Sequence, residues 1–150
     1  MGFLSLAGLE LAELVAAVAG PDRGGIACFI GLVRDHHQGR RVRGIEYRAY
    51  EPMAESVCGA VVAEAEAKWP VRVGLRHRLG ELVVGDAAVV VVTASAHRDE
   101  AFAACRYVIE EVKRRVPIWK RERFDDGTEE WVDPTRLQPS GDLRLGGNGW

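Results

Sequence analysis

The sequence AAVVVVTAS at residues 87–95 and the stretch HRDEAFAACRYVIEEVKRR at residues 97–115 decide the fold class. Four consecutive valines among small apolar residues are typical of a strand in the middle of a sheet. In and just after the second stretch, apolar residues recur three and four positions apart: Phe102, Cys105, Ile109, Val112 and Val116. That spacing predicts one buried stripe on a helix over residues 99–115, which Pro117 ends.

The segments before the valine strand predict a mixture of helices and strands. Residues 6–19 predict a short helix that ends at Gly20-Pro21. Residues 24–33 are almost continuously apolar and predict a strand buried on both faces. Residues 35–43 are polar and basic, which indicates an exposed loop, and residues 44–50 predict a further strand.

A helix and a half-buried strand are predicted for the middle of the chain. Pro52 suits the first position of a helix that ends near Trp69-Pro70. This helix has small apolar residues at helical spacing: Ala54, Cys58, Val61 and Ala65. Residues 71–79 alternate between apolar and basic side chains, as expected of a strand with one buried face.

The last predicted elements form a hairpin, at residues 118–124 and 128–132 around Asp125-Asp126-Gly127. Helices and strands are therefore intermixed, and the predicted fold class is α+β, with a mixed or mostly antiparallel sheet and packed helices. We expect a single domain over residues 1–150, with its core at about residues 24–132 and a flexible tail at residues 134–150.

Composition and charge exclude several classes of protein. Twenty basic and twenty-two acidic residues give a formal charge of −2, so bulk electrostatics predicts no nucleic acid and no membrane as a partner. No apolar run reaches the ~20 residues of a membrane span, and residues 1–20 lack the basic start of a signal peptide, so we expect a cytoplasmic protein. Cys28, Cys58 and Cys105 lie among apolar residues without metal-ligand spacing, which predicts buried, unreactive thiols, no metal and no cofactor.

Basic side chains at the ends of the predicted elements are the candidates for chemistry. Arg34 closes the first apolar strand, His97-Arg98 follows the valine strand, Lys113 lies in the last turn of the helix, and Lys120 comes seven residues later. Strand ends and helix starts are common places for ligand sites. Such a cluster could bind an anion such as a phosphate, and crowded cations lower the pKa of a lysine enough to let it move protons near neutral pH.

The same basic residues can also be explained without a functional site. The helix dipole favours basic residues at any helix C-terminus, and Lys113 could pair with Glu110 on a solvated face. His97 could belong to a helix cap, and Arg34 could belong to a solvated basic loop. A weak RNA-binding face is a further alternative, although an acidic chain without an aromatic-rich basic motif argues against it.

Five blocks of the sequence resemble the MoaE-type large subunit of molybdopterin synthase. They are FIGLVR at residues 29–34, EYRAYEPMA at residues 46–54, HRLGEL at residues 77–82, SAHR at residues 95–98 with Ala101-Phe102, and VPIWKRE at residues 116–122 followed by Trp131. Each block alone is a weak signal, but their order and spacing from about Gly24 to Val132 are specific.

The resemblance implies an α/β hammerhead fold and a sulfur-transfer reaction. Cyclic pyranopterin monophosphate would be converted to molybdopterin by placing two sulfurs on adjacent carbons. The sulfur would arrive as a C-terminal Gly-Gly thiocarboxylate on a small ubiquitin-like subunit of the MoaD type. Because the partner would carry the sulfur, this chain would need no cysteine nucleophile. The resemblance also implies that two large subunits form a homodimer within a heterotetramer.

The resemblance also implies roles for individual residues. The implied substrate-contacting positions are Leu32, Val33, Arg34, His97, Arg98, Lys113, Lys120, Arg121 and Glu122. Among them, Lys113 and Lys120 are the expected catalytic residues, with Lys113 nearest the thiocarboxylate and Lys120 assisting proton transfer or holding developing negative charge. Arg34, His97 and Arg98 would anchor the phosphate and the pterin. A non-catalytic member of the family that only binds a partner is the alternative.

Overall fold

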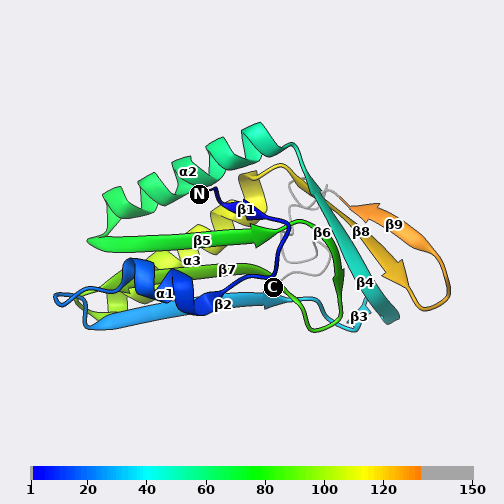
Figure 1. Cartoon of the computed structure of the whole chain (residues 1–150), viewed down its shortest axis with the longest axis horizontal. Helices are drawn as coiled ribbons and strands as arrows, with labels where there is room; N and C mark the ends of the chain where they lie inside the picture. The colour runs from blue at the N-terminus through cyan, green and yellow to red at the C-terminus, as the bar shows by residue number, and fades with distance from the viewer. Residues whose placement is uncertain (1, 133–150) are drawn as a thin grey trace.

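The computed structural model describes residues 2–132, in which three helices pack against two sheets (Figure 1). In chain order the elements are β1 Leu4–Ser5, α1 Leu11–Val18, β2 Gly25–Leu32, β3 His36–His37, β4 Arg40–Ala49, α2 Glu51–Lys68, β5 Val71–Arg78, β6 Gly80–Val83, β7 Ala87–Ser95, α3 Arg98–Arg115, β8 Ile118–Phe124 and β9 Glu129–Val132. The predicted tail at residues 134–150 lies outside the described residues. No helix within residues 2–132 is long and apolar enough to cross a membrane.

The first sheet has the strand order β1-β5-β7-β2, with the valine strand β7 in an interior position as predicted. β5 and β2 pair antiparallel with β7, and the short β1 pairs parallel with β5. Helices α2 and α3 pack on one face of this sheet, and α1 packs on the other (Figure 1). Because both faces are covered, every residue of β7 after Ala87 is buried.

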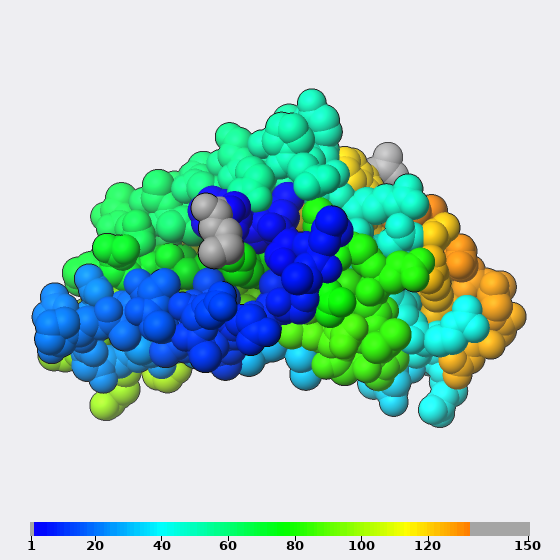
Figure 2. All heavy atoms as spheres, viewed as in Figure 1, coloured from blue at the N-terminus to red at the C-terminus, as the bar shows by residue number. Residues whose placement is uncertain are grey.

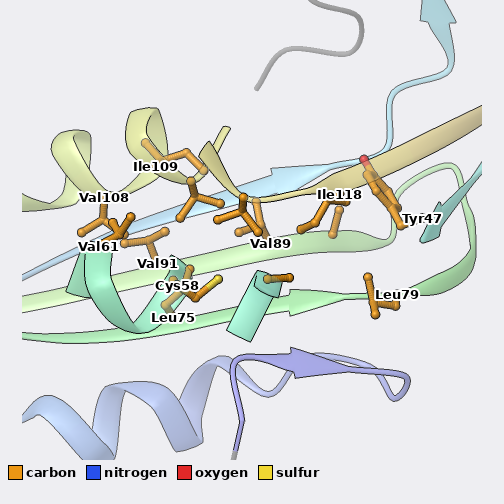
Figure 3. Packing of buried hydrophobic residues seen from close by; sticks show 14 of the residues in the cluster. Tyr47, Cys58, Val61, Leu75, Leu79, Val89, Val91, Val108, Ile109 and Ile118 are labelled. Carbon is orange, nitrogen blue, oxygen red and sulfur yellow. The ribbon is translucent and has the colours of Figure 1, made fainter. Parts of the chain in front are cut away.

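The second sheet lies across one end of the first and is built around β4 and β8 (Figure 1). β8 pairs antiparallel with β4 and β9, while β4 also pairs with β6 and β3. Figure 3 shows Tyr47 of β4 and Ile118 of β8 in the same row of buried side chains as Val89 and Val91 of β7. One continuous core therefore joins the two sheets.

The N-terminal segment lies on the outside of the molecule, against α2 (Figure 2). The Glu55 carboxylate accepts hydrogen bonds from the backbone N–H groups of Phe3 and Leu4, at 2.8 and 2.9 Å. This contact holds β1 beside β5, and α1 begins only at Leu11. The prediction of a helix from residue 6 was therefore wrong for its first turn, because tertiary pairing of residues 4–5 overrides local propensity.

Several predicted elements are confirmed closely. α3 covers Arg98–Arg115, and the hairpin strands β8 and β9 fall within a residue of their predicted limits. The predicted face of α2 is fully buried: Ala54, Cys58, Val61 and Ala65. The fold class, α+β with a mostly antiparallel strand arrangement, is also confirmed.

Other predictions were wrong because an edge strand and a hairpin escaped detection. β2 is an edge strand, and Ile26, Ile30 and Leu32 are exposed on one of its faces, so residues 24–33 are not buried on both sides. Residues 35–43 form the hairpin β3–β4 around Gln38-Gly39 instead of a loop, and the four-residue strand β6 was not predicted. Gln38 and Gly39 both have positive φ, the backbone that a tight two-residue turn requires.

Two side chains were also placed wrongly. Cys28, predicted to be buried, is exposed on β2, whereas Cys58 and Cys105 are buried, and burial raises their thiol pKa values to about 12 and about 11. Phe102, predicted for the buried stripe of α3, is 63% exposed. Both exposed residues line a groove between β2 and α3, at the edge of the first sheet.

Candidate functional site

The alternation of β8 places two charged side chains inside the protein. Lys120, Glu122 and Phe124 lie two residues apart on one face of the strand and are buried, whereas Trp119 and Arg121 point to the other face. Lys120 is 4% exposed and Glu122 is 1% exposed. Charged groups are rarely buried to this degree unless they are paired or functional.

Lys120 and Glu122 form an ion pair in this buried position. The Nζ of Lys120 lies 3.8 Å from Oε1 of Glu122, and within residues 2–132 that oxygen has no hydrogen-bond partner. Burial lowers the pKa of Lys120 to about 8, and Lys113 and Arg34 lower it as well, while Glu122 acts in the opposite direction. A lysine in this state can gain or lose a proton close to neutral pH.

Lys113 and Arg34 reach the same region from two other elements. Lys113 lies in the last turn of α3, and burial together with the nearby Arg34 charge lowers its pKa. Arg34 follows the end of β2 and adds a positive charge next to both lysines. The fold therefore brings together Arg34, Lys113, Lys120 and Glu122.

A groove of about 440 Å³ runs between β2 and α3 and reaches Lys113. Its walls are mostly apolar and include Phe29, Phe102 and Ile109. Within residues 2–132, no group of three or more metal-ligating side chains could hold a metal ion. The groove therefore brings an apolar surface up to the cationic side chain of Lys113.

His97 and Arg98 lie at the opposite end of α3 from Lys113. They sit at the N-terminus of the helix, next to Gly25 at the start of β2, where a Cβ built on Gly25 would lie 3.5 Å from the Arg98 Cα atom. An 18-residue helix is about 27 Å long, so this pair is not part of the Lys113–Lys120 cluster within one chain. His97 is the N-cap residue of α3, as in the alternative that assigned it to a helix cap, although its side chain makes no capping hydrogen bond.

Three other expected contact residues lie outside the cluster. Val33 is 2% exposed and belongs to the hydrophobic core, while Leu32 is 47% exposed on β2. Arg121 lies on the outer face of the second sheet, where it contacts Glu46 and Glu129. Strand alternation places Arg121 on the opposite face of β8 from its neighbours Lys120 and Glu122.

Two residues that sequence reasoning did not single out belong to the surroundings of Lys120. Tyr47 of β4 is the cross-strand neighbour of Lys120, and burial with the nearby Glu122 charge raises the pKa of its hydroxyl. His37 of β3 lies within electrostatic reach of Lys120, Glu122 and Arg34. His37 follows Arg34 by only three residues, which could have suggested that it lies near the cluster. The prediction of an exposed loop for residues 35–43 led away from that conclusion.

Comparison with known proteins shows the family. The MoaE protein family model matches residues 4–115 of the chain. Molybdopterin synthase catalytic subunit 1 of Mycobacterium tuberculosis is 47% identical over 125 residues, which are 83% of this chain and 84% of the relative. The chain belongs to the MoaE family.

Solved structures agree with this membership of the MoaE family. A molybdopterin synthase structure from Staphylococcus aureus superposes with a TM-score of 0.83 at 32% identity and covers 87% of this MoaE chain and 95% of its own. A structure described as a complex of subunits 1 and 2 of the molybdopterin-converting factor from Helicobacter pylori shares the fold, with a TM-score of 0.69 at 21% identity over 85% of this chain and 87% of its own. The hammerhead architecture expected for the MoaE family is therefore present.

Proposed function

We propose that this chain is the catalytic subunit of a molybdopterin synthase. It transfers sulfur from the thiocarboxylated C-terminus of a small ubiquitin-like subunit to cyclic pyranopterin monophosphate and so forms the dithiolene of molybdopterin. The observation that carries this proposal is the buried Lys120–Glu122 pair beside Lys113 and Arg34. Groups with strongly shifted pKa values gather at functional sites, so a buried lysine whose pKa lies at about 8 favours a catalytic role over a binding module.

The charges of the cluster fit the charges of these reactants. Both the cyclic phosphate and the thiocarboxylate are anions, and Arg34 and Lys113 supply positive charge where the buried site opens. The Arg34 guanidinium can donate hydrogen bonds to two phosphate oxygens at once. Binding of either anion would also offset the repulsion among the cations of the site.

The two lysines are suited to different tasks. Lys113 is less buried than Lys120 and lines the groove between β2 and α3, so we assign it to the thiocarboxylate and the carbon that the sulfur attacks. Lys120 is buried, and its low pKa makes it the group that takes up protons during the reaction. We assign Glu122 to holding Lys120 in place and setting its charge state, and not to contacting the substrate.

His97 and Arg98 join this site only if a second subunit supplies them. β2 is an edge strand with an exposed apolar face, the kind of surface that pairs with another chain. Antiparallel pairing of two β2 strands in a symmetric dimer would place the Gly25 end of one strand beside the Leu32 end of the other. His97 and Arg98 of the second subunit, which adjoin its Gly25, would then face Arg34.

The small subunit supplies the sulfur and completes a heterotetramer with the homodimer. Its extended C-terminal tail would approach Lys113 through the groove, and backbone contacts are the usual means of recognising such a tail. The sulfur source is then on the partner, so the reaction needs no thiol from Cys28, Cys58 or Cys105.

Reconstitution tests this function directly. The chain is mixed with a thiocarboxylated ubiquitin-like partner and cyclic pyranopterin monophosphate, and molybdopterin is measured. Lys113→Ala should remove product formation while partner binding and thermal stability stay unchanged, and Lys68→Ala, which changes an exposed lysine on α2, should have full activity. Turnover by Lys113→Ala close to that of the unmodified protein would rule out the assignment of this lysine.

A non-catalytic role within the same family is the second candidate. Such a protein would retain the groove and would bind the partner without turnover. Tight partner binding by the unmodified chain with no molybdopterin formed would favour it over the synthase.

A further inference from the structure

The hairpin β3–β4 has two different faces. His37 pairs with Arg40 and His36 pairs with Arg41, so the members of each pair lie on the same face of the two strands. His37 and Arg40 are half-buried, whereas His36 and Arg41 are exposed. The hairpin therefore turns His37 and Arg40 towards the protein and the other pair towards solvent.

Arg40 fixes this inner face against the β8–β9 hairpin. Its guanidinium lies 3.5 Å from the centre of the Phe124 ring, and it donates hydrogen bonds to the side chains of Thr128, Asp126 and Glu130. Phe124 occupies the same face of β8 as Glu122 and Lys120. The neighbour of Arg40 on this inner face, His37, is thereby held near the buried ion pair.

Charged side chains act on His37 from three parts of the chain. Lys120 and Glu122 face it from β8, Arg34 from the chain after β2, and Glu130 from β9. Desolvation by burial lowers the pKa of His37, and Lys120 and Arg34 lower it further against the opposing effect of the two glutamates. The imidazole is therefore neutral at neutral pH and has a free electron pair with which to accept a proton.

The Lys120 side chain is largely shielded from solvent. It is 4% exposed, yet a lysine that takes up a proton in each turnover must release that proton before the next. His37 is half-buried, so its ring can face both the buried pair and water. Of the other histidines within residues 2–132, His97 lies at the far end of α3 and His36 is exposed beside Asp35. His77 packs against the Tyr47 ring but is 2% exposed and hydrogen-bonded to Arg78, so its ring does not reach solvent.

We propose that His37 is the proton relay between Lys120 and solvent. This role rests on the proposed function, in which Lys120 takes up a proton during sulfur transfer. In the resetting step an N–H bond of the Lys120 ammonium breaks, a new N–H bond forms on the neutral His37 ring, and the imidazolium then passes the proton to water. Because the imidazole has the lower pKa of the two groups, it holds the proton only briefly.

Removal of the imidazole and its replacement from solution test the relay. In His37→Ala, kcat should fall about tenfold or more while KM for the pterin changes little, because proton transfer and not binding is affected. Added imidazole should restore part of the lost kcat. His36→Ala is the matched control, since His36 is exposed, points away from the site and is hydrogen-bonded to Asp35, and it should have unchanged kcat with no response to imidazole.

A second variant separates the relay from a structural role. His37→Gln preserves hydrogen bonding but cannot carry a proton, so it should lose kcat to the same extent while its thermal stability stays at the unmodified value. Full activity of His37→Gln, or a loss in His37→Ala that imidazole does not restore, would overturn the relay. Failure of the proposed function is distinguishable, because the unmodified protein would then form no molybdopterin at all.

Discussion

The Nζ of Lys120 and the Oε1 of Glu122 lie 3.8 Å apart on the inner face of β8, where both side chains are buried. Burial penalises the charged form of the lysine, and the carboxylate partly offsets that penalty. The resulting pKa of about 8 leaves roughly a tenth of Lys120 neutral at pH 7. The pair therefore keeps a lysine close to the point where it can change its charge.

Replacement of this lysine by arginine tests whether proton transfer matters more than positive charge. Arginine retains the charge but does not lose its proton in proteins. We expect Lys120→Arg to reduce kcat by a factor of about 10² to 10⁴ in single-turnover measurements, as for loss of a general acid or base. The same change at the exposed Lys68 should have no effect, and an active Lys120→Arg would mean that charge alone suffices.

The pH dependence of turnover should report the Lys120 pKa. Because the neutral amine accepts the proton, kcat should rise with pH through a midpoint near 8. Glu122 raises the pKa of Lys120, so Glu122→Gln should move this midpoint to lower pH. Profiles of kcat against pH for both proteins measure the shift.

A control for this shift is available on the other face of the second sheet. Glu129 pairs with Arg121 and Arg123 there, away from Lys120. Glu129→Gln should leave the midpoint where it is in the unmodified protein. A midpoint that moves upward in Glu122→Gln would contradict the proposed effect of the buried carboxylate.

Much of the fold could be predicted from local patterns, whereas sheet edges could not. The valine strand and the apolar stripe of α3 are encoded within 30 residues of sequence, so their positions follow from periodicity. The exposure of Ile30 and Cys28 depends on which strand lies beside β2, and apolar runs do not reveal whether a neighbour is present.

The site was only partly predictable for a related reason. Alternation along VPIWKRE sends Lys120 and Glu122 inward and Arg121 outward, but the direction is set only when β8 pairs with β4. The separation of His97 from Lys113 could have been foreseen, because both lie on one 18-residue helix and its length is about 27 Å. The family resemblance assigned both residues to one site because it identifies positions in the sequence and does not say how far apart they lie within one chain.

The contact that holds α3 to α2 should make stability depend on pH. The Glu64 carboxylate accepts hydrogen bonds from Arg115 and from the Tyr107 hydroxyl, and these bonds lower its pKa from 4.5 to about 2. A lowered carboxyl pKa contributes stability above about pH 4.5, and that contribution is lost as pH falls towards 2. Glu64→Gln should therefore lower Tm at pH 7, and the difference should shrink as the pH falls.

Thermal unfolding of a surface variant provides the comparison. Glu110 pairs with Arg106 on the exposed side of α3, and exposed pairs contribute little to stability. Glu110→Gln should have nearly the same Tm as the unmodified protein at both pH values. An equal loss of Tm in the two variants would show that the Glu64 contact stabilises the protein no more than an exposed ion pair does.

The position of His97 and Arg98 leads to a prediction about the dimer. Arg98→Ala and Lys113→Ala should each be inactive alone, because the proposed site takes Lys113 from one subunit and Arg98 from the other. In a mixed dimer of the two variants, one site combines an intact Lys113 with an intact Arg98, and the other has lost both. Mixed dimers purified with two different tags should therefore recover about half of the unmodified activity. If a single subunit supplied both residues, neither site would be complete and no activity would return.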